Sequence, residues 1–138
     1  MNLIPHFTFD GHAEEALNFY VSVFKGKAEC ILRFKDFREE LPEGVSEKEM
    51  NRIMYSMVSI GEGCRIAICD FCSEEKIKNG STIFMDISYT GVAELKRVYE
   101  ALAAGGKILM PMAKTSWSDN FASVIDKFGI GWNLMQEK

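Results

Sequence analysis

The chain has 138 residues, of which 47% are hydrophobic and 26% charged, so it holds enough material for one domain with a sizeable core. Its 16 Lys and Arg against 20 Asp and Glu give a formal net charge of −4, which disfavours nucleic acid and anionic membrane surfaces as partners. No stretch approaches the roughly 18 apolar residues that a membrane-spanning helix needs. The first eleven residues lack a cationic segment, so we expect no signal peptide, reduced cysteines and a cytoplasmic protein.

The first half of the chain predicts a strand, a helix and three further strands. Polar and aromatic side chains alternate in the first segment, which is typical of a half-buried strand. Acidic Glu14 and Glu15 begin the helix and Gly26 follows its end. A polar stretch at residues 35–51 predicts a long mobile loop of the kind that often serves as a lid. In chain order, the five elements are expected at residues 6–9, 12–24, 28–34, 53–60 and 64–70.

The second half repeats this plan. Its elements are expected at residues 83–89, 92–104, 107–112, 121–126 and 132–136. A shift of eighty positions lays Thr8 on Ser88 and Gly26 on Gly106 without a gap. We therefore predict an α+β fold of two tandem βαβββ modules, at about residues 1–71 and 81–138, that form curved mixed sheets around a cavity within a single domain spanning 1–138.

The alternation of the strands indicates which side chains would line this cavity. A four-stranded sheet with a helix on one face leaves its other face open, and two such sheets can enclose a space. Phe7 and Phe9 are expected under the first helix, so His6 and Thr8 would point into the cavity. The same reasoning directs Asp86 and Ser88 there from the second module.

Several segments carry a family resemblance. They are FTFDGHAEEALNFY near the start, RIMYSMVSIGEG, ALAAGGK, and KTSWSDNFASVIDKFGIGW near the end, of which the last is the most specific. Through them the chain resembles the vicinal oxygen chelate superfamily, which includes glyoxalase I, extradiol dioxygenases and the bleomycin-resistance proteins, and within it the PhnB-like branch. The resemblance implies a homodimer with its site in the cavity, and the superfamily supports several chemistries on one scaffold.

The resemblance also implies where a metal would bind. Metal-dependent members use inward-facing His and carboxylate ligands, and His6 and Asp86 occupy two of those positions. The third, normally Glu, falls on Asn133, whose amide oxygen is a weak neutral ligand. We therefore expect no cofactor and no firmly held metal. The alternative is a metal-dependent lyase, isomerase, transferase or dioxygenase in which His6 and Asp86 hold a divalent ion.

The favoured function is the binding of a small, partly apolar molecule, whether by a sequestering protein or by a metal-free enzyme. Trp117, in a polar loop, could cover the cavity mouth or anchor a dimer contact. A third interpretation is an interaction module with a collapsed cavity. The expected ligand-binding wall consists of His6, Thr8, Asp86, Ser88, Trp117, Phe121 and Asn133.

The cysteines carry weaker predictions. Cys30 and Cys64 are expected to behave as small core residues. The spacing of Cys69 and Cys72 matches redox and zinc motifs, but with no second pair it is expected to be fortuitous. Relatives in the PhnB-like branch have been labelled ubiquinone-pathway methyltransferases, and the sequence carries no recognisable S-adenosylmethionine motif.

Overall fold

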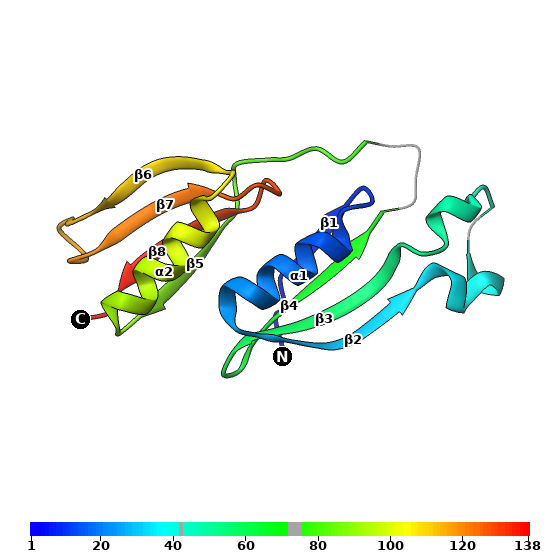
Figure 1. Cartoon of the computed structure of the whole chain (residues 1–138), viewed down its shortest axis with the longest axis horizontal. Coiled ribbons are helices and arrows are strands. Elements are labelled where there is room, and N and C mark those ends of the chain that lie inside the picture. Colours follow the sequence, from blue (N-terminus) through cyan, green and yellow to red (C-terminus); the bar gives the residue numbers. More distant parts are fainter. Residues whose placement is uncertain (42, 72–75) are drawn as a thin grey trace. The chain divides into compact units, whose positions relative to one another are not determined.

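The computed structural model describes residues 1–41, 43–71 and 76–138 (Figure 1). The chain forms two compact units, Met1–Ile77 and Lys78–Lys138. Cys72, the second cysteine of the Cys-x-x-Cys spacing, lies outside the described residues.

Unit 1 is a four-stranded mixed sheet with one helix. The strands lie in the order β1-β4-β3-β2, with β1 parallel to β4 and the other pairs antiparallel. Figure 1 shows α1 lying across one face of this sheet. The elements are β1 (His6–Phe9), α1 (Ala13–Phe24), β2 (Lys27–Arg33), the short 3-10 helices η1 (Phe34–Glu40) and η2 (Glu47–Glu49), β3 (Ile53–Gly61) and β4 (Cys64–Asp70).

Burial of apolar side chains fixes α1 against the sheet. Phe7 and Phe9 are 6% and 7% exposed, and the Phe7 ring meets Tyr20 of α1 edge-on at 5.7 Å. Buried Asp70 fastens the start of the helix to the start of β3. Its Oδ1 accepts a hydrogen bond from the Ala13 amide at 3.0 Å, and its Oδ2 accepts one from the Ile53 amide at 3.1 Å. The predicted burial of the two phenylalanines is confirmed.

The polar stretch at residues 35–51 contains more local order than the sequence indicates. Both short 3-10 helices lie in or next to it. Glu49 accepts a hydrogen bond from the Ser46 amide at 2.9 Å, which satisfies a donor at the start of η2. Arg38 of η1 pairs with Glu47 of η2 at 3.0 Å. Side-chain contacts between polar neighbours, rather than apolar periodicity, hold these turns, so hydrophobic patterning does not predict them.

Unit 2 repeats the plan. Its strands lie in the order β5-β8-β7-β6, again with one parallel pair, β5 with β8, and α2 lies across one face (Figure 1). The predicted α+β fold with a βαβββ plan in each half is therefore confirmed. The elements are β5 (Phe84–Tyr89), α2 (Val92–Ala103), β6 (Lys107–Ala113), β7 (Phe121–Ile125) and β8 (Gly131–Gln136).

The repeated glycines have a common physical reason. A Cβ on Gly26 would lie 2.1 Å from the Ser59 carbonyl oxygen, and a Cβ on Gly106 would lie 2.2 Å from the Ile125 carbonyl oxygen. In each unit the chain leaving the helix passes so close to a neighbouring strand that only glycine fits. The eighty-residue shift therefore preserves a packing requirement.

Two expectations about side chains are wrong. Cys30 and Cys64 are exposed rather than in the core, because β2 is an edge strand of its sheet and Cys64 begins β4 beside a hairpin turn. Ile83 lies outside β5 and is 73% exposed, although the alternation predicted it as a strand residue.

Candidate functional site

Each sheet has a face opposite its helix, here called its helix-free face. On unit 1, His6 and Thr8 lie on this face, since they alternate with Phe7 and Phe9 under α1. Strand pairing places Ala67 of β4 opposite His6 and Cys69 of β4 opposite Thr8. Ala67 and Cys69 therefore share the helix-free face with His6 and Thr8. His6 and Thr8 therefore lie on the face opposite Phe7 and Phe9, as the alternation predicts, and their role in a ligand site stays a prediction.

His6, Cys69 and Thr8 form a polar cluster on this face. His6 Nε2 lies 3.1 Å from Cys69 Sγ, which in turn lies 3.7 Å from Thr8 Oγ1. The His6 ring also meets Tyr55 edge-on at 6.0 Å. Burial raises the pKa of the Cys69 thiol, the hydrogen bond with Thr8 opposes the rise, and the charge of Asp70 adds to it. The Cys69 thiol is therefore a protonated, weakly polar group on the helix-free face at neutral pH.

The sequence prediction considered Cys69 only as part of a Cys-x-x-Cys spacing and missed its place beside His6. A signal for it was available. Ile66 and Ile68 of β4 are core residues, so alternation places Cys69 on the opposite side of the strand. Its meeting with His6 depends on the parallel pairing of β1 with β4.

The helix-free face of unit 2 carries a row of three polar side chains from three adjacent strands. Asp86, Asn133 and Ser123 stand opposite one another in the strand register. Ser123 Oγ donates to Asn133 Oδ1 at 2.8 Å, and Asn133 Nδ2 donates to Asp86 Oδ1 at 2.8 Å. The structure thus brings together two predicted site residues, Asp86 and Asn133, and adds Ser123, which the sequence prediction missed.

The remaining predicted residues of unit 2 lie near the next position along the strands. Phe121 pairs with Met135, and Met135 pairs with Ser88. Ser88 Oγ donates a hydrogen bond to Glu137. Trp117, which is 55% exposed, packs edge-on against Phe121 with ring centroids 5.4 Å apart. The face therefore joins a polar row to an aromatic pair.

The described part of each unit can be searched for side chains that could hold a metal ion together. Among the described residues, no group of three or more His, Cys, Asp and Glu side chains is placed to hold a metal ion. Within their own units, His6 adjoins a thiol, and Asp86 adjoins the Asn133 amide. That amide already accepts a hydrogen bond from Ser123 through its oxygen and donates one to Asp86 through its nitrogen. The Asn133 amide therefore orients Asp86 and is poorly suited to complete the ligand shell of a metal ion.

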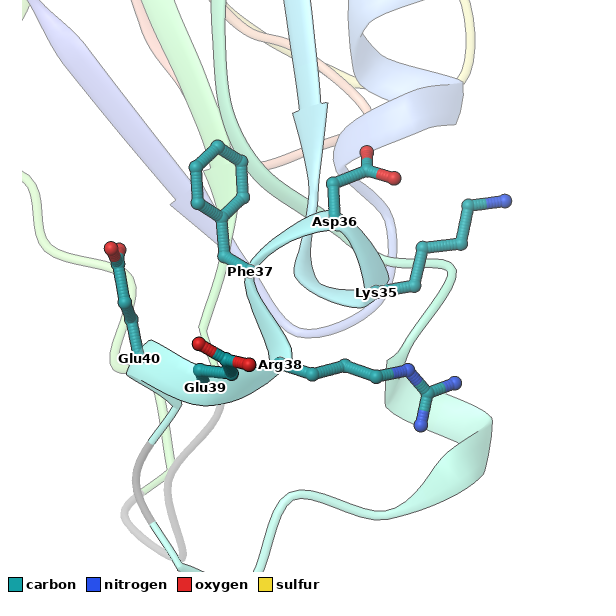
Figure 2. A pocket seen from close by; sticks show the side chains of 6 residues that line it. All are labelled: Lys35, Asp36, Phe37, Arg38, Glu39 and Glu40. Carbon is teal, nitrogen blue, oxygen red and sulfur yellow. The ribbon is translucent and has the colours of Figure 1, made fainter.

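A hollow of about 310 Å³ lies along η1 and contains none of the predicted site residues. Its lining is a single run, from Lys35 to Glu40, in which five of the six side chains are charged. Figure 2 shows that Lys35 and Arg38 point to one side and Glu40 to the other. Side chains that diverge in this way do not provide the convergent polar groups of a ligand site.

Among the described helices, none combines the length and apolar character needed to cross a membrane.

The sequence model of a family described as 3-demethylubiquinone-9 3-methyltransferase matches residues 1–135. The chain belongs to this family. Among curated proteins, YjdN of Escherichia coli K12 is 30% identical over 142 aligned positions, which cover 97% of this chain and 94% of YjdN.

The fold of this chain is similar to those of several solved structures. Protein PA1353 of Pseudomonas aeruginosa has a TM-score of 0.85 at 25% identity, covering 99% of this chain and 98% of that one. A Bacillus cereus protein described as a putative 3-demethylubiquinone-9 3-methyltransferase, PhnB protein, has a TM-score of 0.82 at 25% identity, covering 99% and 100%. A glyoxylase/bleomycin resistance protein/dioxygenase domain from Frankia shares the fold, with a TM-score of 0.64 at 13% identity and coverage of 100% and 98%. The predicted resemblance to PhnB-like proteins is confirmed, and the fold is that of the glyoxylase/bleomycin resistance/dioxygenase domain.

Proposed function

We propose that this PhnB-like protein binds a small, partly apolar molecule at the helix-free faces of its sheets, without a firmly held metal ion. The supporting observation is the composition of the two faces. Each combines a hydrogen-bonded polar group, His6 with Cys69 or Asp86 with Asn133, with apolar or aromatic neighbours. Ligand sites typically consist of apolar walls with a few fixed polar groups that orient the ligand.

The metal-free form is favoured by the state of Asn133. In the metal-dependent alternative this residue or solvent would complete a shell begun by His6 and Asp86. Its oxygen instead accepts the Ser123 hydroxyl at 2.8 Å, so ligation would require breaking a hydrogen bond for a weak neutral ligand. The row is better suited to orient an organic ligand through Asp86.

Thermal denaturation across a panel of small aromatic and aliphatic acids, alcohols and amines tests the binding. A ligand present at one hundred times its Kd stabilises the folded protein by about 2.7 kcal/mol. We expect at least one chemical class to raise the Tm and Asp86→Asn or His6→Gln to reduce the rise. Glu100→Gln, on exposed α2 surface, is a control with the same change of charge as Asp86→Asn. A panel without any shift, together with an empty protein in native mass spectrometry, would favour the pure interaction module.

Elemental analysis of protein purified without chelator tests the absence of a firmly held metal. We expect a substoichiometric content that dialysis removes. One equivalent of a divalent metal that survives dialysis and disappears in both His6→Gln and Asp86→Asn would establish the metal-dependent enzyme instead.

We also propose a cytoplasmic homodimer. The dimer is supported by β6, an edge strand on which Ile108, Leu109 and Met110 are 49%, 42% and 44% exposed. Exposed apolar edge strands tend to be covered by a partner. Light scattering should give about twice the 15.6 kDa chain mass, and Leu109→Lys should lower it. A monomeric mass at micromolar concentration would contradict the dimer, and cell fractionation tests the location.

A further inference from the structure

The hydrogen bonds on the helix-free face of unit 2 have a fixed direction. A carboxylate can only accept, so Asn133 must turn its amide nitrogen toward Asp86. The amide oxygen then faces Ser123, whose hydroxyl must donate. The donors therefore run from Ser123 through Asn133 to Asp86, and the row ends in a negative charge.

The charged end of the row has acceptor capacity left over. Asn133 bonds Asp86 at Oδ1, and among the described residues nothing donates a hydrogen bond to Oδ2 and no Lys or Arg pairs with the carboxylate. Asp86 is exposed on β5, an edge strand of its sheet. A second carboxylate, Glu137, accepts from Ser88 two residues along the same strand. This part of the face offers acceptors and negative charge, which complement a cationic donor.

The apolar part of the face lies at a defined separation from this charge. Phe121 lies in β7, two strands from Asp86 in β5. Its register position is that of Ser88, two residues along β5 from Asp86. With about 4.8 Å between strands and about 3.3 Å per residue, the two Cα atoms lie roughly 12 Å apart. Trp117 packs on the same ring. An ammonium group at Asp86 and an aromatic body near Trp117 and Phe121 can therefore belong to one small molecule.

We propose that this face binds a protonated primary amine carried on a short chain with an aromatic or apolar body. The inference rests on the proposed function and names its ligand class. The ammonium donates to Asp86, and the body packs against the Trp117–Phe121 pair. Neutral and anionic molecules of the same shape lack the positively charged N–H donor that pairs with the Asp86 carboxylate.

Three probes with one body and different heads test the proposal: 4-phenylbutylamine, 4-phenylbutan-1-ol and 4-phenylbutyrate. Affinities are measured by NMR titration, with the Asn133 side-chain amide as a reporter beside Asp86. We expect the amine to bind about fivefold or more tighter than the alcohol, and the carboxylate to bind weakest. The preference for the amine should fall as salt is raised, because part of it is electrostatic.

Asp86→Asn removes the charge while keeping the size of the side chain and an oxygen that can accept from Asn133. In this variant the amine should bind no tighter than the alcohol. Glu100→Gln should leave the preference unchanged, and an unaltered urea midpoint confirms that both variants fold. Equal affinity for amine and alcohol in the unaltered protein, or an amine preference that survives Asp86→Asn, overturns the inference.

The outcomes separate the two proposals. If the alcohol or the carboxylate binds and the amine does not, the ligand class is wrong and the binding function stands. If none of the three probes binds and the wider panel gives no thermal shift, both proposals fail.

Discussion

Replacing Asp126 by asparagine should destabilise unit 2 strongly, because this buried carboxylate holds the turn between β7 and β8. Asp126 is 3% exposed. Its Oδ1 accepts from the amides of Phe128 and Ile130 at 2.9 and 3.1 Å, and its Oδ2 accepts from Trp132 Nε1 at 2.8 Å. Asparagine has one acceptor oxygen, so its amide nitrogen would face an N–H donor in either orientation.

The size of the effect follows from the burial of the indole. Trp132 is 1% exposed, so water does not replace the lost acceptor. A hydrogen bond to a charged group contributes about 1.5–3 kcal/mol, and an unsatisfied buried donor costs about 1–3 kcal/mol. These contributions overlap, and we expect the free energy of unfolding to fall by about 2–4 kcal/mol.

Urea unfolding followed by fluorescence measures this change. The chain has two tryptophans, so a Trp117→Phe background leaves Trp132 as the only reporter, and it lies in unit 2. Asp126→Asn should lower the midpoint by roughly 1–2 M. Asp119→Asn is the matched control, since Asp119 is 65% exposed and its ion pair with Lys114 at 3.4 Å should contribute less than about 1 kcal/mol. If the two variants unfold at the same midpoint, Asp126 does not hold the turn.

Three further predictions concern the scaffold and the thiols. Gly106→Ala should destabilise unit 2 by at least about 2 kcal/mol in urea unfolding, because the new Cβ would clash with backbone atoms. Gly80→Ala is the control and should change little, since no described atom lies within 4 Å of the position of its Cβ. Equal midpoints for the two variants would refute the close approach at Gly106. A hydrogen bond from Arg33 holds the pKa of Glu14 below its ordinary value of 4.5. Glu14→Gln should therefore lower the free energy of unfolding by less than about 1 kcal/mol at pH 6–7, and this difference should shrink as the pH falls below about 4.5. A difference that grows in acid would contradict this sign. Since burial raises the pKa of Cys69, iodoacetamide at pH 7.5 should label exposed Cys64 faster than Cys69 in peptide mass spectrometry, and the reverse order would place Cys69 in a more accessible, ionised setting.

The strand and helix plan was predictable because its signals are local. Alternation over residues 6–9 and 83–89 assigned a face to each side chain, and the helical spacing of apolar residues in 92–104 agrees with the burial of Leu95, Val98 and Leu102 in α2. Interior side chains follow from hydrophobic patterning. The exposure of a side chain on an edge strand does not follow from this patterning, because it depends on how many neighbours the strand has. Cys30 in edge strand β2 was therefore wrongly predicted to be buried.

The polar groupings were not predictable to the same degree. Strand alternation selected Asp86 and the family resemblance selected Asn133, but neither indicated Ser123 or the place of Cys69 beside His6. The sequence also identified the stretch around Asp126 as distinctive without indicating that its carboxylate accepts from the Trp132 indole. A hydrogen bond between strands requires knowledge of which strands are neighbours and in what register.

By itself, the sequence determined the two βαβββ units and the faces of their strands, since both rest on residue spacing along the chain. Its motifs, and not that spacing, carried the resemblance to PhnB-like proteins. The tertiary structure decided which polar side chains meet. His6 reaches Cys69 across 63 positions and Asp86 reaches Asn133 across 47, each through a parallel strand pair. A shift of that pairing by one residue would send every side chain of a strand to the opposite face, so the register, and not the composition, creates the candidate site.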